Sequence, residues 1–168
     1  MAQKLRGKWA AGIQPKNFTW VIKDRFAICE RPGGFGDGHR RVRRQEEIIW
    51  LRENGFDVVV SLIQASHNLH NYEELQMPYR HRPLQPDELE TYLPALYREL
   101  DDLMNSGSRV VMHGEELGDR VVGVVGGWIR WKGLVEDPTD AITMTEQLTG
   151  RKLDPFARQV IMRADEFR

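Results

Sequence analysis

The sequence is short of three things that would point to a particular class of protein. It has one cysteine, Cys29, which can form neither an internal disulfide nor a cysteine-based zinc site, so a reducing, cytoplasmic setting is expected. Its formal net charge is −1, which gives no general attraction to nucleic acid or to an anionic membrane. No apolar run is long enough for a signal peptide or a membrane span. These shortages argue against secreted, nucleic-acid-binding and membrane-embedded proteins.

The remaining composition is ordinary for a folded domain. The chain has 168 residues, of which 40% are hydrophobic and 29% are charged. This length predicts a single domain over residues 1–168. Residues 1–17 are interpreted as a polar leader, with Trp9 as its candidate docking residue. The composition gives no indication of an oligomeric state.

Segments typical of strands and of helices alternate along the chain. Apolar and β-branched runs predict two short strands within 18–29, with a turn at Lys23 and Asp24, and further strands over 57–63, 79–84 and 109–112. A glycine-rich loop over 30–39 and a polar stretch over 64–78, with one helical turn, lie between them. Periodicity and capping residues predict helices over 41–54, 86–105, 120–132, 137–148 and 154–167.

Two of these segments indicate the fold class. The run over 57–63 is almost wholly apolar, as in a strand that is buried on both faces of a parallel sheet. Five leucines fall on one face of the 86–105 helix, and Pro94 lies inside that pattern, where it can kink the helix. The alternation therefore predicts an α/β fold with a central, mainly parallel sheet flanked by helices.

The stretch VVMHGEELGDRVVGVVGGW, residues 110–128, has the outline of a strand, a tight loop and a helix. Such a loop can bind an anion because successive backbone N–H groups point inward and the helix dipole adds partial positive charge. An arginine at the end of the loop can hold two anion oxygens at once. The predicted anion-binding loop consists of His113, Gly114, Glu115, Glu116, Leu117, Gly118, Asp119 and Arg120.

This loop resembles that of the small dual-specificity phosphatases, a branch of the cysteine-dependent protein tyrosine phosphatases, which have His-Cys, five residues and then Arg. The resemblance extends over residues 12 to about 148, through GIQPKNFTWVIKDRFAI, LRENGFDVVVSLI and VVGVVGGWIRWKGL. It implies the fold of that family, with His113 as a structural residue that braces the loop. It also implies a chemistry in which a cysteine thiolate attacks phosphorus and an aspartate protonates the leaving group.

At three positions the sequence departs from the pattern that this chemistry needs. Gly114 stands where the family has its nucleophilic cysteine, and glycine cannot form a phosphoenzyme. Val121 stands where a hydroxyl residue usually follows the arginine, and Leu117 replaces a glycine in the middle of the loop. The general acid is also irregular, because its candidate, Asp87, lies only 27 residues before Gly114. A capping or first-turn role at the start of a helix explains Asp87 more simply.

The charges around the loop also differ from those of an ordinary phosphate site. Glu115, Glu116 and Asp119 each oppose an incoming anion, and a pair of like charges about 8 Å apart costs roughly 2 kcal/mol at an effective dielectric near 20. Two arrangements remain open at this point. Arg120 either faces an open anion site or is neutralised by one of these acids, which would close the pocket.

The sequence therefore predicts a catalytically inactive phosphatase-like protein, a pseudophosphatase, that binds a phosphorylated ligand or a protein partner and needs no cofactor. One alternative is a hydrolase in which Glu115 or Glu116 activates water for attack on a phosphoester. Another is an engineered replacement of the cysteine by Gly114.

Other candidate sites have plainer explanations. Arg40, Arg41, Arg43 and Arg44 could form a docking patch, but a solvated helix start with an Arg43–Glu47 pair is favoured. His67 and His70 could share a helical face as metal ligands, yet no third ligand is evident, so no metal site is expected. Cys29 is interpreted as a buried core thiol, and the GGFGDG stretch as a flexible loop.

Overall fold

The computed structural model describes residues 11–66 and 68–168, and the leader residue Trp9 lies outside that range. Its centre is a five-stranded sheet with the order β1-β2-β5-β3-β4. The strands are β1 (Thr19–Ile22), β2 (Phe26–Cys29), β3 (Val58–Ser61), β4 (Tyr79–His81) and β5 (Val110–His113). Only β1 runs antiparallel to its neighbour, and the other pairs are parallel. The predicted α/β class with a mainly parallel sheet is confirmed.

The helices follow the predicted order, with differences at their ends. They are α1 (Arg41–Glu53), α2 (His70–Glu74), α3 (Leu89–Asn105), α4 (Asp119–Trp131), α5 (Pro138–Thr149) and α6 (Pro155–Met162). Short 3-10 helices accompany them, among them η2 (Gly36–Gly38), η3 (Pro86–Glu88) and η4 (Ala164–Phe167). The helix predicted over 154–167 is therefore split into α6 and η4, and the strand predicted over 79–84 ends at His81. No helix within the described residues is long and apolar enough to cross a membrane.

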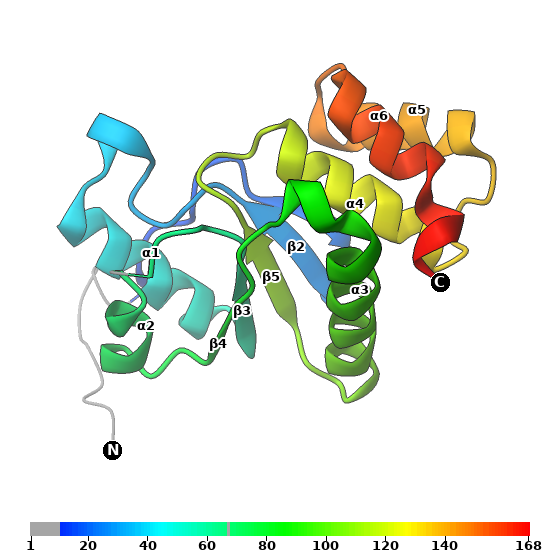
Figure 1. The fold of residues 1–168 in the computed structure, drawn as a ribbon. Helices are drawn as coiled ribbons and strands as arrows, with labels where there is room; N and C mark the ends of the chain where they lie inside the picture. The colour runs from blue at the N-terminus through cyan, green and yellow to red at the C-terminus, as the bar shows by residue number, and fades with distance from the viewer. Residues whose placement is uncertain (1–10, 67) are drawn as a thin grey trace.

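The sheet is covered on both faces, which explains its continuous apolar runs. Alternate residues of each central strand point to opposite sides. Phe26, Ile28 and Met112 face α3 and α4, whereas Ala27, Val59 and Val111 face α1 and α2. Figure 1 shows α1 and α2 on one side of the sheet, α3 and α4 on the other, and α5 and α6 outside α4.

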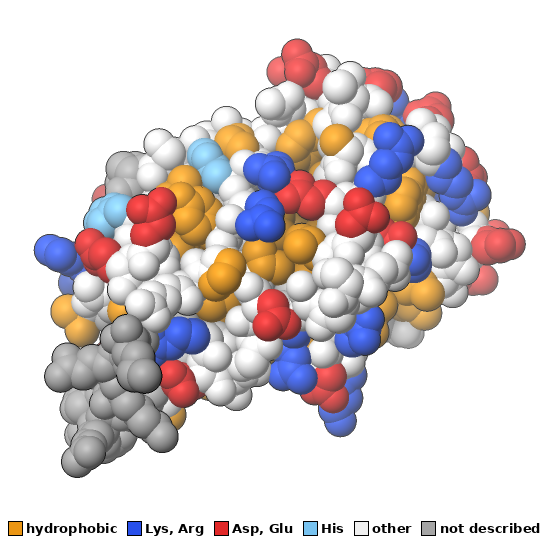
Figure 2. Space-filling view, turned by 90° about the horizontal axis from the view of Figure 1, so that it is seen from below, with side chains coloured by type: hydrophobic (Ala, Val, Ile, Leu, Met, Phe, Trp, Pro, Cys, Tyr) orange, Lys and Arg blue, Asp and Glu red, His pale blue; other side chains and the backbone are white. Residues whose placement is uncertain are grey.

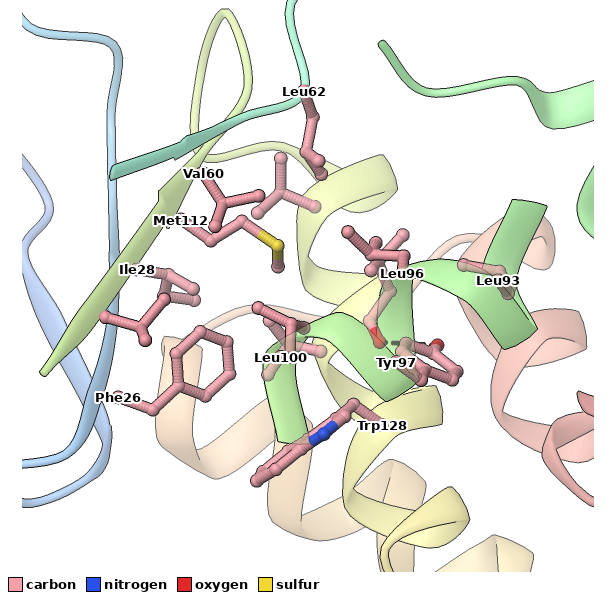
Figure 3. Packing of buried hydrophobic residues seen from close by; sticks show 14 of the residues in the cluster. Phe26, Ile28, Val60, Leu62, Leu93, Leu96, Tyr97, Leu100, Met112 and Trp128 are labelled. Atoms are coloured by element: carbon pink, nitrogen blue, oxygen red, sulfur yellow. Dashed lines mark hydrogen bonds between the residues drawn. The ribbon is translucent and has the colours of Figure 1, made fainter. Parts of the chain in front are cut away.

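The larger core lies between the sheet and α3. Leu89, Leu93, Leu96 and Leu100 are buried on the predicted face, and Leu103 packs partly buried against them. In Figure 3, Leu100 lies among Phe26, Met112 and Trp128, which belong to the same core cluster. The Tyr97 hydroxyl donates a hydrogen bond of 2.7 Å to the Val124 carbonyl. The helix continues through Pro94 as a single element.

Helix α4 is held by burial, as its weak helix propensity predicts. Its residues from Val121 to Arg130 are all buried. A Cβ at Gly123 would lie 2.7 Å from the Ala157 Cα, and a Cβ at Gly127 would lie 2.5 Å from the Tyr97 hydroxyl. The glycines therefore let α6 and α3 pack directly against the α4 backbone, which fixes where the first turn of α4 lies.

This packing predicts that Gly123→Ala destabilises the protein. Alanine adds about 1 kcal/mol of helix propensity, but overpacking against a backbone atom costs about 1–3 kcal/mol and sometimes more. Because the contact is with a buried backbone atom, the upper part of that range applies, and we expect a net loss of about 1–2 kcal/mol in the free energy of unfolding, measured by urea denaturation. Gly38→Ala is the matched control, because a Cβ there meets no atom within 4 Å. Equal stability of the two variants would contradict the packing argument.

Candidate functional site

A pocket of about 410 Å³ lies at the carboxyl ends of β3 and β5, where parallel sheets commonly bind ligands. Most of the loop that follows β5 forms one side, together with the first residues of α4. The segments that follow β3 and β4 form an apolar wall, and the N-cap residue of α6, Asp154, completes the lining. The lining residues are Leu62, Ile63, Gln64, Leu84, Gly114, Glu115, Glu116, Gly118, Asp119, Arg120, Val121 and Asp154.

The loop leaves its backbone donors open. Within the described residues, no hydrogen bond uses the backbone N–H groups of residues 114–119. Helix α4 has Gly118 as its N-cap, with no side chain capping its first turn. Successive unpaired N–H groups at a helix start form a nest that favours an anion. The anion-binding role of the loop itself stays a prediction.

His113 braces this loop from beneath and is buried. Its Nδ1 lies 2.9 Å from the Gly114 carbonyl oxygen, and its Nε2 lies 3.0 Å from the Tyr72 hydroxyl oxygen. Because a carbonyl only accepts, Nδ1 carries the hydrogen, and Nε2 accepts from the Tyr72 hydroxyl. The His113 pKa is lowered from 6.5 to about 4. Burial is the main cause of this decrease, and the charge of Arg31 also contributes to it. The imidazole is therefore neutral at pH 7.

The position of the missing nucleophile has no room for a side chain. A Cβ at Gly114 would lie 2.6 Å from the Val121 Cγ2, which is closer than real Cβ atoms approach. The backbone of Gly114 is outside the left-handed region, so its dihedral angles do not require glycine. Two of the departures found in the sequence, Gly114 and Val121, are therefore linked by packing. The Val121 methyl lies where the Cβ of a side chain at position 114 would be.

The acids of the loop are divided between paired and unpaired side chains. Glu115 forms a 2.9 Å ion pair with Arg31, which follows β2. Asp119 forms a 3.0 Å ion pair with Arg151, and Arg151 also donates to the Leu117 carbonyl. Neither ion pair was predicted, because the two arginines are distant in the sequence and belong to no motif.

The ion pairs decide between the two arrangements that the sequence left open. Arg120 is exposed and makes no hydrogen bond or ion pair with any part of the chain that the structure describes. Glu116, whose side chain lies beside Gly118, is likewise without a partner there. Within the described residues, Arg120 is therefore not neutralised by the acids of its own loop.

Asp87 lies outside this site. It is exposed, in the first turn of η3, and does not line the pocket. The side chain makes no capping hydrogen bond, so the first-turn interpretation holds and the capping one does not. The acid that does line the pocket at a helix start is Asp154, which accepts a 2.8 Å hydrogen bond from the Ala157 N–H. The Asp-Pro pair at 154–155 signals that helix in the sequence, but nothing in it indicates the pocket.

The four arginines at the start of α1 differ in their exposure to solvent. Arg43 pairs with Glu47 at 2.9 Å, as expected. Arg44 corrects the prediction of a solvated helix start, because it is only 7% exposed and lies against His39. Arg40 and Arg41 are exposed. On the face that Figure 2 shows, basic and acidic side chains are interspersed, so that face has no one-signed charge patch.

Cys29 and His70 do not line the pocket. Cys29 is fully buried on the α1 side of the sheet, and burial raises the pKa of its thiol, so it is a core residue as predicted. His67 is outside the described residues, so the expectation that it and His70 form no metal site stays a prediction. Among the residues that the structure describes, no group of histidine, cysteine and acidic side chains could hold a metal ion.

The sequence matches no protein-family model and no curated protein. Its fold is similar to that of kinase associated phosphatase with its catalytic-site cysteine replaced by serine, at 15% identity over 89% of this chain and 94% of that chain, with a TM-score of 0.74. The core catalytic domain of a PP-IP phosphatase from S. cerevisiae, in complex with citrate, matches at 16% identity over 92% and 89%, with a TM-score of 0.67.

A human tyrosine phosphatase-like serine/threonine/tyrosine-interacting protein matches at 11% identity over 88% of this chain and 95% of that chain, with a TM-score of 0.62. These likenesses show that the chain has the dual-specificity and tyrosine phosphatase-like fold. The fold that the resemblance in the sequence implied is confirmed.

The contact between positions 114 and 121 predicts a coupled pair of substitutions. Gly114→Ala forces the Val121 methyl aside and should cost about 1–3 kcal/mol of stability. When combined with Val121→Ala, which vacates the space, we expect the double variant to be at least about 1 kcal/mol more stable than the sum of the single effects. Chemical denaturation of all four proteins measures this coupling. The pair Gly114→Ala and Val122→Ala should be additive, and additivity at position 121 as well would contradict the contact.

The His113 pKa predicts a pH dependence of stability. Because the folded pKa is about 4 and the unfolded value is 6.5, the unfolded chain takes up the proton first as the pH falls. The contribution is complete above pH 6.5 and is lost towards pH 4, with about 2 kcal/mol already lost at pH 5. Urea denaturation at pH 7.5 and pH 5 should show a correspondingly smaller loss in His113→Asn. Identical losses in the two proteins would rule out a neutral, buried His113.

Proposed function

We propose that this protein is a pseudophosphatase, which binds a phosphorylated ligand in the loop pocket without the cysteine chemistry of its structural relatives. One observation carries the proposal. The space of the nucleophile is occupied by the Val121 methyl, whereas the open loop N–H groups and Arg120 are retained. The site has therefore lost the reacting atom and kept the parts that bind an anion.

The chemistry of cysteine-dependent hydrolysis has no residue to perform it here. It requires a thiolate in line with phosphorus, and Gly114 offers no side chain. Cys29 cannot substitute, because it is fully buried on the face of the sheet that packs against α1. The residue after Arg120 is a valine, so it provides no hydroxyl to assist a leaving thiolate. These three features support a site that binds its ligand without the cysteine-dependent reaction.

The electrostatics of the loop are compatible with an anion. Two of its three acids are neutralised by Arg31 and Arg151. Arg120 has no competing partner within the described residues, so it can donate two charge-assisted hydrogen bonds to a phosphoryl group. The open N–H groups of the loop supply further donors.

A second function has one observation in its favour. Glu116 lines the pocket and has no partner among the described residues, whereas Glu115 is held by Arg31. A hydrolase that activates water would therefore use Glu116 as its base. Such an enzyme would release phosphate from an aryl phosphate at a rate that falls in Glu116→Gln.

The proposal predicts anion binding that depends on Arg120. We expect phosphate, tungstate and phosphorylated amino acids to bind the native protein, and Arg120→Ala to weaken binding by roughly 10- to 100-fold, since a charge-assisted hydrogen bond contributes about 1.5–3 kcal/mol. Calorimetric titration measures the affinity, and Arg98→Ala is the control, because Arg98 is exposed on α3 and does not line the pocket.

Two results would count against the proposal. Equal affinity of the native and Arg120→Ala proteins would remove the anion site. Steady release of phosphate from an aryl phosphate, abolished by Arg120→Ala, would show an enzyme and not a binding module. Dependence of that turnover on Glu116 would then establish the water-activating alternative.

A further inference from the structure

The pocket that we assign to a phosphoryl group is not lined by positive charge alone. Among the described residues that line it, Arg120 is the cation, whereas Glu115, Glu116, Asp119 and Asp154 are acidic, and Glu115 and Asp119 are held by ion pairs. We infer that the ligand is a phosphorylated polypeptide segment with lysine or arginine side chains next to the phosphorylated residue. This inference rests on the proposed function and specifies the ligand of the same site.

Two of these carboxylates keep acceptor atoms for a ligand. Glu116 has no partner within the described residues, and Asp154 uses only Oδ1 to cap α6. Asp119 is held through Oδ2 by Arg151, and its buried Oδ1 has no hydrogen-bond partner among the described residues and lies out of a ligand's reach. A ligand that pairs with Glu116 and Asp154 must bring hydrogen-bond donors. Lysine and arginine side chains carry such donors.

These charges discriminate between classes of phosphorylated molecules. A ligand with several phosphoryl groups, such as a nucleoside triphosphate or a nucleic acid, would place further negative charges beside the carboxylates and be repelled. A single phosphoryl group can use Arg120 and the loop N–H groups, provided that its neighbours are not acidic. Cationic side chains beside the phosphorylated residue would instead be attracted by the carboxylates of Glu116 and Asp154, which form the acidic rim of the pocket.

The size and lining of the pocket favour a peptide over a free ion. Its volume of about 410 Å³ lies in the range of roughly 300–1,000 Å³ that is typical of sites for ligands larger than an ion. Leu62, Ile63 and Leu84 form an apolar wall opposite the loop. The aliphatic stem of a lysine or arginine, or an aromatic ring, can pack on such a wall while the charged end reaches a carboxylate.

The test uses three phosphopeptides of equal length that differ only in whether the two residues on each side of the phosphorylated residue are lysine, serine or glutamate. Each is made with phosphotyrosine and with phosphoserine, and binding is measured by fluorescence polarisation. We expect the lysine-flanked peptide to bind at least 10-fold more tightly than the glutamate-flanked one. Unphosphorylated peptides should bind at least 10-fold more weakly than their phosphorylated counterparts.

Variants of the protein connect this preference to the pocket. Glu116→Gln removes one charge, and Asp154→Asn removes another while keeping a residue that caps α6. In the double variant we expect the preference for lysine to fall below 3-fold. Glu136→Gln is the matched control, since it removes an exposed acid beyond the far end of α4 and should retain the full preference.

Each contrary outcome has a distinct meaning. Equal binding of the three phosphopeptides, or a preference for glutamate, overturns this inference and leaves the proposed function standing. Equal binding of unphosphorylated and phosphorylated lysine peptides overturns it as well. Tighter binding of phosphocholine than of any peptide shows a small zwitterionic ligand and excludes the polypeptide. Failure of every phosphorylated probe, with no effect of Arg120→Ala on phosphate binding, removes the proposed function itself.

Discussion

The burial of β5 on both faces of the sheet is the constraint on which the site depends. β5 lies between β2 and β3, and helices pack on both of its sides, so its end point cannot shift without disturbing the two cores. His113 closes this strand, and its hydrogen bonds join the loop carbonyl to Tyr72 of α2. The next helix begins where the glycines of α4 allow contact with α3 and α6. The loop is therefore fixed at both ends by packing.

Gly114 and Val121 are in contact across the loop and the first turn of α4. The Val121 Cγ2 methyl lies 2.6 Å from the position that a Cβ at residue 114 would take. The loop keeps its path because glycine at 114 accepts this methyl. The residue at position 114 therefore depends on the packing of Val121 in the first turn of α4.

The electrostatics of the pocket are set by residues outside the loop. Arg31 and Arg151 hold Glu115 and Asp119, which leaves Arg120 unpaired within the described residues. The same pairing does not neutralise Glu116 or Asp154, so the rim remains acidic around a single cation. This distribution of charge is the basis of the proposed phosphorylated ligand and of its proposed cationic neighbours.

The sequence by itself determined the fold class, the place of the loop and the absence of a nucleophile. These follow from local signals, namely the apolar runs of the strands, the leucine period of α3, and the identities of residues 113–121. The tertiary structure alone decided which acids are neutralised, that Arg44 is buried, and that Asp154 belongs to the pocket. Such contacts join residues far apart in the chain, and no local pattern of charge or periodicity encodes which distant partner a side chain meets.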